Sequence, residues 1–346
     1  MNLKIKIDYC VLVLLCVCIM AIEANYWALI PRFGIGNNMI YVVWIIMLFF
    51  ILLVSKAKIR SIPFVLFWIL YLMLVLLYNQ ELLHGRYFET IRIVLCILSM
   101  LIFTKNANWT KFAPKFILLI GIPNVIATVL FFLNNALYRS FIAATYKIYQ
   151  SGTANGLYGY KAGIADHYSQ NGTYISVVFV VICVTLFCLK MSRRKKIMLT
   201  VFAVIAAFAI FLTSKRAHIL FSIAAVLFTY YLANKSKGSK KVLRTVIIVA
   251  IIAIFGAAIL EFVPELSLTI DRFQNAGTDS ASTYRFVMWE YALNDFLNNP
   301  LIGSGWYGFS YDEKIAYVPG AAAGAHNIYV QLLYETGIVG FVIGVT

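Results

Sequence analysis

Long runs of apolar residues separated by short polar segments dominate this sequence. The hydrocarbon core of a bilayer is about 30 Å thick, so a helix needs roughly 20 mostly apolar residues to cross it. Ten runs approach this length, and we expect a membrane-spanning helix at each of them. The runs are 9–30, 39–54, 62–78, 91–103, 112–133, 174–189, 197–212, 217–233, 242–263 and 328–346.

The composition supports this interpretation. Of the 346 residues, 62% are hydrophobic and only 12% are charged, and the mean hydropathy is +0.85. Soluble domains are typically about half apolar and a quarter charged. The sequence therefore predicts an all-α, polytopic membrane protein of about ten transmembrane helices, organised as a single transmembrane domain over 1–346. The first run has no small-residue cleavage site, so we expect it to be retained as a span.

The distribution of charge predicts how the spans are oriented. When they alternate sides, most of the 29 Lys and Arg residues fall in the segments on one face, and most of the 14 acidic residues fall on the other. Basic loops remain in the cytoplasm, which places the amino terminus there and the acidic loops outside. The formal net charge of +15 is then explained by topology, and we expect no nucleic-acid partner.

The cysteines indicate neither disulfides nor a metal site. All six lie inside apolar runs, without a CxxC spacing or suitable neighbouring histidines. We expect no cofactor and no metal.

Two external connections, 134–172 and 261–326, are much longer than the others, and long loops often carry function. Within the second, the apolar residues of 282–298 recur with helical spacing, which predicts a helix near the membrane surface. Ser280 or Ser282 can cap it. Asn299-Pro300 ends it.

Arg285 falls in the first turn of this predicted helix, where a cation opposes the helix dipole. A bound anion or a nearby acid would compensate. A solvated Arg285, or one paired with Asp279, is the alternative.

The rest of the second loop carries aromatic and polar residues up to the last span. The aromatic residues of 303–308 can stack on sugars, although a position among lipid headgroups is favoured. Asn327 or His326 can cap the last helix. Asn327, Gln331 and Glu335 then form a polar stripe that we expect to face a protein interior. Gly337, Gly340 and Gly344 form a second stripe, which allows close helix packing.

Lys215 and Arg216 interrupt a long apolar stretch at a turn predicted to be tight and external. Their location opposes the positive-inside preference. Snorkelling toward headgroup phosphates would explain the pair. The functional alternative is a cationic pocket for a phosphorylated ligand, in which Arg216 makes bidentate contacts.

Taken together, these motifs resemble the O-antigen ligase and polymerase superfamily over 197–346. The resemblance is carried by Ser214-Lys215-Arg216, by Arg285 within Tyr-Arg-Phe-Val-Met-Trp-Glu-Tyr-Ala-Leu, by Asn299-Pro300-Leu301-Ile302-Gly303-Ser304-Gly305, by His326-Asn327-Ile328-Tyr329 and by Glu335-Thr336-Gly337-Ile338-Val339-Gly340. The order, the spacing and the topology all agree with the superfamily.

The resemblance implies a metal-independent envelope glycosyltransferase in the bacterial cytoplasmic membrane, with its active site on the external face. Such an enzyme transfers a glycan from a polyprenyl-pyrophosphate carrier to an acceptor hydroxyl. By position, Arg216 and Arg285 match residues that hold the pyrophosphate, Lys215 is a substitute for Arg216, and His326 matches a proposed general base. Arginines can stabilise the charge of the leaving group, and a histidine can accept a hydroxyl proton near neutral pH.

Two features depart from the family pattern. Arg216 lies one position later than in a plain Ser-Arg pair, because Lys215 intervenes. The chain also stops within the last span, where family members continue into further helices, so a truncated form is one interpretation.

Three functions remain open at this point. The first is polymerisation of lipid-linked repeat units into a capsule, an exopolysaccharide or an O-antigen, and the Tyr-rich loop 134–172 favours it. The second is ligation of a finished glycan to lipid A core or to protein. The third is a transporter or flippase for lipid-linked sugars, which would instead place basic residues through a central cavity.

Overall fold

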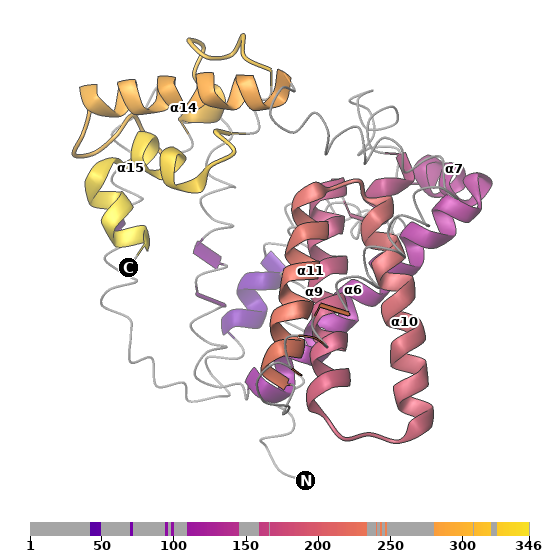
Figure 1. The fold of residues 1–346 in the computed structure, drawn as a ribbon. Helices are drawn as coiled ribbons and strands as arrows, with labels where there is room; N and C mark the ends of the chain where they lie inside the picture. Colours follow the sequence, from indigo (N-terminus) through magenta and orange to yellow (C-terminus); the bar gives the residue numbers. More distant parts are fainter. Residues whose placement is uncertain are drawn as a thin grey trace. The chain divides into compact units, whose positions relative to one another are not determined.

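The computed structural model describes the chain in several ranges. These are 42–49, 70–71, 94–95, 98–99, 109–144, 159–165, 167–233, 240, 243, 246–247, 280–306, 308–319 and 324–345. All regular elements in these ranges are helical (Figure 1), in agreement with the predicted all-α class. The predicted span 9–30 lies wholly outside the described residues, 62–78, 91–103 and 242–263 lie mostly outside them, and only the part 42–49 of 39–54 is described, as helix, so the count of ten stays a prediction.

Five described helices are long and apolar enough to cross a membrane. They are α6 (Trp109–Leu133), α9 (Tyr168–Cys188), α10 (Arg193–Leu212), α11 (Arg216–Ala233) and α15 (Ile328–Val345). For α6, the part that qualifies is Ala113–Leu133. The structure also contains α7 (Asn135–Ala144), α14 (Ser280–Asn298) and the short 3-10 turns η4 (Gly159–Ala162) and η6 (Phe309–Tyr311).

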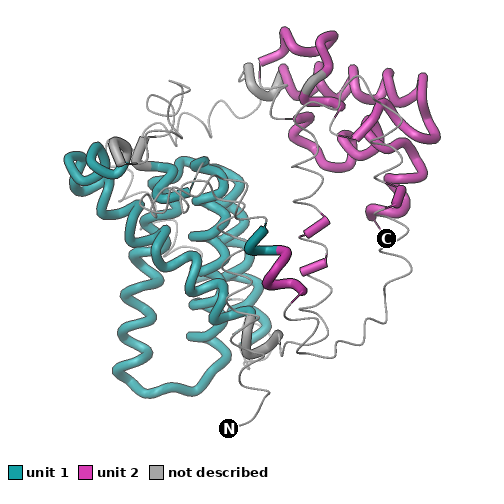
Figure 2. Tube along the Cα trace, turned by 180° about the vertical axis from the view of Figure 1, so that it is seen from behind, with its two compact units in different colours: residues 1–44, 108–274 teal, residues 45–107, 275–346 magenta. Residues whose placement is uncertain are grey.

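The chain divides into two compact units, coloured separately in Figure 2. Unit 1 comprises residues 1–44 and 108–274, and unit 2 comprises residues 45–107 and 275–346. Each unit has its own buried apolar core, and each is described here by itself.

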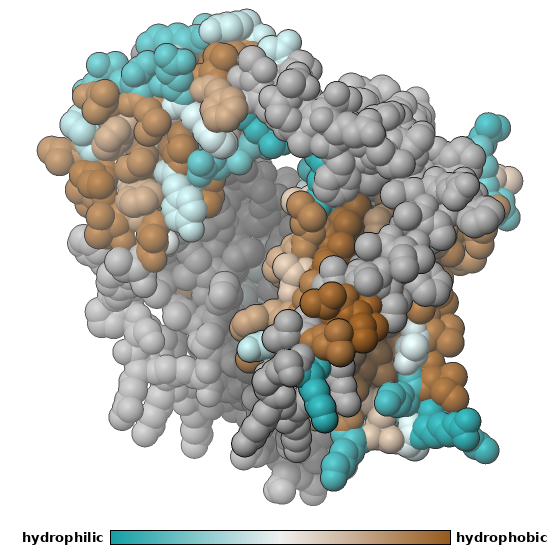
Figure 3. Space-filling model, viewed as in Figure 1, coloured by the Kyte–Doolittle hydropathy of each residue, from teal (hydrophilic) through white to brown (hydrophobic). Residues whose placement is uncertain are grey.

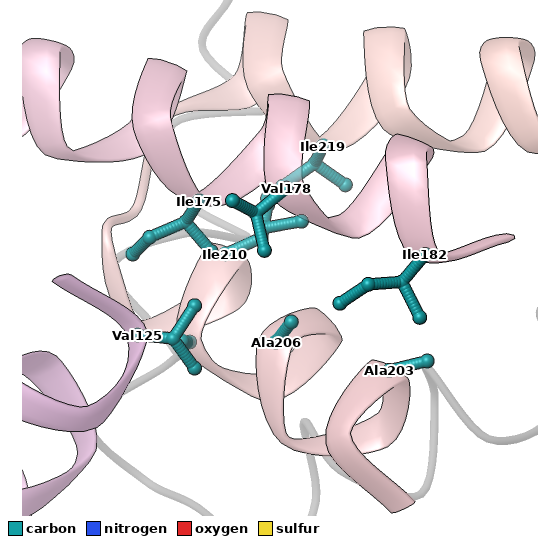
Figure 4. Close-up of a cluster of buried hydrophobic side chains, with 9 residues drawn as sticks. Val125, Ile175, Val178, Ile182, Ala203, Ala206, Ile210 and Ile219 are labelled. Carbon is teal, nitrogen blue, oxygen red and sulfur yellow. The ribbon is translucent and has the colours of Figure 1, made fainter. Parts of the chain in front are cut away.

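Unit 1 is a helical bundle in which α9 packs against α6, α10 and α11. Its core consists of small and β-branched side chains from these helices (Figure 4). Val125, Val178 and Ala206 in this core are completely buried. The close approach of α6 and α9 requires Gly121, since a Cβ there would lie 1.9 Å from Val178 Cγ2.

Helix α9 begins at Tyr168, six residues before the start predicted from hydropathy. The first turns of α9 are polar, so the hydropathy pattern did not include them in the span. Asn171 shows how these polar residues are accommodated. Asn171 is fully buried, and its Nδ2 donates to Thr128 Oγ1 and to the Lys161 carbonyl, both at 2.8 Å. These bonds fasten η4, a part of the predicted loop 134–172, to α6 and α9.

The outer faces of the bundle fit a lipid environment. Large apolar side chains such as Val204 and Phe228 are each 65% exposed, and such extensive apolar surface marks a membrane contact. In Figure 3 apolar residues gather along the bundle, while the lower end near the start of α10 is hydrophilic. The exposed basic residues Arg193, Arg194, Lys195 and Lys196 form that start. The protein is therefore a membrane protein.

Unit 2 contains α14, η6 and α15 with the segment that joins them. Met288 and Ala292 of α14 are buried together with Phe309, Ala325 and Tyr334. The core shows that the segment between α14 and α15 folds back against both helices.

Candidate functional site

Lys215 and Arg216 lie at a tight turn, as the sequence predicted. Helix α10 ends at Leu212 and α11 begins at Arg216. Ser214 between them has φ 53°, a left-handed conformation that is uncommon outside glycine. The reversal leaves Lys215 and Arg216 partly buried.

The first turns of α9 form the surroundings of Lys215. Its Nζ lies 4.7 Å from the centroid of the Tyr168 ring, at the start of α9, within the range of a cation–π contact. One turn later, Gly172 lies against His218, since a Cβ there would be 2.5 Å from His218 Cδ2. Sequence reasoning did not single out His218, although it lies three residues after Lys215.

Arg285 lies on α14, in unit 2, and is exposed. The helix begins at Ser280, so Ser282 lies inside the first turn and Arg285 is the sixth helical residue. The expected conflict with the helix dipole is therefore wrong, because that effect fades beyond the first turn. Trp289 follows one turn after Arg285, on the same face of α14.

His326 lies two residues before Ile328, the first residue of α15, and has φ 54°. Ser214 and His326 are the two residues other than glycine with positive φ in the described chain. Strain of this kind concentrates at functional sites. Asn327 provides the predicted cap of α15: its Oδ1 accepts from the Tyr329 and Val330 backbone N–H groups, at 3.1 and 3.4 Å.

The residue before His326 connects it to the helix that carries Arg285. The carbonyl of the buried Ala325 accepts a hydrogen bond from Trp289 Nε1 at 2.7 Å. Ala325, the residue before His326, is thus anchored to α14 at a position one helical turn after Arg285. Lys215 and Arg216 belong to unit 1, whereas Arg285 and His326 belong to unit 2.

The predicted polar stripe of α15 exists. Gln331 Nε2 donates to Glu335 Oε1 at 2.9 Å, and Glu335 is only 2% exposed. The glycine stripe differs from expectation, because Gly337 interrupts the helix with φ 63° and ψ −172°. The backbone N–H groups of Ser304 and Gly305 reach the carbonyls of Tyr334 and Glu335 near this break, at 2.7 and 3.1 Å.

Sequence reasoning missed the role of Asp312. Its carboxylate accepts hydrogen bonds from the hydroxyls of Tyr291 and Tyr334 and from the Lys314 N–H. Burial raises the pKa of Asp312. The three hydrogen bonds and the charge of Lys314 lower it by more than burial raises it, so the pKa of Asp312 lies below its usual value. Asp312 thereby joins the loop to α14 and α15.

Two further features bear on the chemistry of the site. Trp306 is 6% exposed, so it does not present its ring at the surface as expected. Among the described residues, no group of three His, Cys, Asp or Glu side chains is arranged to hold a metal ion. The residues that the sequence singled out for chemistry are the cations Lys215, Arg216 and Arg285 and the imidazole of His326, which belongs to an exposed residue.

Residues 201–345 match the family model described as O-Antigen ligase. This segment contains Lys215, Arg216, Arg285 and His326. The match confirms the resemblance drawn from the sequence motifs. No curated protein and no solved structure matches the chain.

Proposed function

Because residues 201–345 match the family model described as O-Antigen ligase, we propose that this protein is a metal-independent membrane glycosyltransferase. Its donor is a glycan linked through pyrophosphate to a polyprenol, and its site faces the outside of the bacterial cytoplasmic membrane. The amino terminus lies in the cytoplasm. The basic segments such as 193–196, opposite the turn at Lys215, support this orientation.

The proposed roles follow from the chemistry of the four side chains. Arg216 and Arg285, with Lys215, bind the pyrophosphate and stabilise the charge that it gains on leaving. His326 accepts the proton of the acceptor hydroxyl. The hydroxyl oxygen bonds to the anomeric carbon while the bond from that carbon to the pyrophosphate oxygen breaks, and the polyprenyl pyrophosphate departs with the electron pair.

The observation that carries the proposal is the backbone of His326. Within the matched region, an exposed imidazole follows a buried residue bonded to α14, and it has the disfavoured φ of 54°. Backbone strain of this kind is concentrated at functional sites, and a general base requires a fixed position.

The favoured reaction is polymerisation of lipid-linked repeat units into a surface polysaccharide, which includes O-antigens, capsules and exopolysaccharides. The Tyr-rich segment 134–172 supports it, as tyrosine rings suit contact with a growing glycan. The alternative is ligation of the finished glycan to lipid A core or protein. A lipid-linked sugar transporter is less favoured, since Lys215 and Arg216 lie at the end of a span rather than within it.

The test is to reconstitute the purified protein in liposomes with polyprenyl-pyrophosphate-linked repeat units and to resolve the products by mass. A ladder spaced by one repeat unit is expected. A single transfer, seen only after lipid A core or protein acceptor is added, would replace polymerase with ligase. Movement of the donor between leaflets without a new glycosidic bond would overturn the proposal.

A further inference from the structure

Ala325, which precedes His326, is held by side chains from two helices. Its carbonyl accepts from Trp289 Nε1 of α14 at 2.7 Å, and its N–H donates to Gln331 Oε1 of α15 at 3.3 Å. The residue is completely buried. Both polar groups of this backbone unit are therefore fixed, and with them the direction in which the chain enters His326.

Gln331 is oriented in turn by Glu335. The Ala325 N–H requires an acceptor, so the amide oxygen of Gln331 faces it and the amide nitrogen faces away. That nitrogen donates to Glu335 Oε1 at 2.9 Å. Glu335 is only 2% exposed, and burying a carboxyl group on a membrane-spanning helix costs free energy. Its hydrogen bond to Gln331, which orients the amide, gives a reason for this buried carboxyl group.

The backbone near His326 is adapted to this arrangement. Gly324 has φ 92°, and a Cβ there would lie 2.6 Å from Gln331 Oε1, so a larger residue would push the amide away from Ala325. On the other side, Asn327 caps α15. His326 therefore lies between two residues whose backbones are both tied to their surroundings.

We infer that Trp289, Gln331 and Glu335 are positioning residues that hold the His326 imidazole in its working place. The inference rests on the proposed role of His326 as general base. The φ of 54° is disfavoured for a residue with a Cβ, and the hydrogen bonds at Ala325 stabilise it. Such precision matters, because a displacement of about 1 Å lowers turnover roughly a hundredfold.

The kinetic test compares variants along this network in the full-length, reconstituted protein. Gln331→Met removes the acceptor for Ala325 at similar length, and Glu335→Leu removes the partner of Gln331. We expect each to lower kcat by about tenfold to a hundredfold, with the donor KM changed less than about twofold. The double variant should be no worse than Gln331→Met alone, since both substitutions break one path.

Conservative variants and a control separate positioning from general damage. Glu335→Gln keeps an oxygen that can accept from Gln331, so it should retain most of the kcat that Glu335→Leu loses. Trp289→Phe removes the Nε1–H donor to Ala325 but keeps an aromatic ring beside Phe286, and we expect a reduced kcat. Val345→Met, at an exposed position of the same helix, should behave as wild type.

A second readout does not depend on activity. The chain has four histidines, and the imidazole signal of His326 in a ¹⁵N-histidine NMR spectrum is identified by its loss in His326→Asn. Gln331→Met should shift or broaden this signal, and Val345→Met should not. If the signal responds in a protein that transfers no glycan, the proposed function fails while the positioning survives. If Gln331→Met keeps both the kcat and the His326 signal, the positioning inference is overturned.

Discussion

Gly337 lies directly against Leu301: a Cβ on Gly337 would be 2.3 Å from the Leu301 carbonyl oxygen. The N–H groups of Ile338 and Val339 donate to the carbonyls of Pro300 and Leu301, at 2.8 and 3.4 Å. The segment after α14 thus inserts its backbone at the break in α15. This contact explains why the sequence has both the motif at 299–305 and a glycine at position 337.

Gly337→Ala should destabilise unit 2 strongly. The φ of 63° and ψ of −172° lie in a region open essentially to glycine alone, at a cost of about 1–3 kcal/mol for other residues, and the contact with Leu301 adds to it. Thermal unfolding of the purified protein measures the loss. Gly344→Ala, at an exposed position of α15, is the matched control, and equal melting of the two variants would contradict the break at Gly337.

Ser214 sets the turn that presents Lys215 and Arg216. Glycine adopts a positive φ without strain, so the free energy of unfolding of Ser214→Gly should lie within about 1 kcal/mol of the wild-type value. A β-branched residue is a genuine outlier there, and Ser214→Val should lose about 1–3 kcal/mol. Donor binding should weaken in Ser214→Val alone. Similar stability and similar donor affinity in both variants would show that the turn tolerates any residue.

Asp312 should contribute stability that depends on pH. Its folded pKa lies below the usual value, so the contribution is complete above the unfolded pKa of about 4 and is lost as the pH falls through the folded pKa. Asp312→Asn should destabilise by about 1–3 kcal/mol at pH 7, because Tyr291 and Tyr334 lose a charged acceptor. Melting curves at neutral and acidic pH check this, and the gap between variant and wild type should narrow below about pH 4. A gap that is constant with pH would exclude the titration of Asp312.

His326→Ala should abolish glycan transfer but retain donor binding, whereas Arg285→Ala should weaken binding as well. Loss of a general base typically costs about 10²- to 10⁴-fold in rate. His326→Asn is the sharper variant, because asparagine tolerates the positive φ and removes only the imidazole. Product formation and donor affinity are measured separately. Transfer at the wild-type rate in His326→Asn would end the assignment of this residue as base.

The sequence by itself determined much of the architecture. Runs of apolar residues predict the spans α6, α9, α10, α11 and α15 because hydrophobic length is a local property. The turn at Lys215 and the cap at Asn327 could also be read locally. The ordered motifs from Ser214 to Gly340 were sufficient for the resemblance that the match over 201–345 confirms.

Only the tertiary structure decided how the polar residues are used. The six additional residues at the start of α9 are too polar for a hydropathy pattern, and the bonds of Asn171 to Thr128 and Lys161 show why they are tolerated. The role of Asp312 depends on Tyr291 and Tyr334, which are distant in sequence and are brought to it only by the fold. The sequence predicted Gly337 to be a helix-packing position, whereas the structure shows a break in α15 where the backbone of Leu301 lies against Gly337. Apolar burial follows from composition along the chain, whereas a buried hydrogen bond or a left-handed residue depends on partners that only the folded chain supplies.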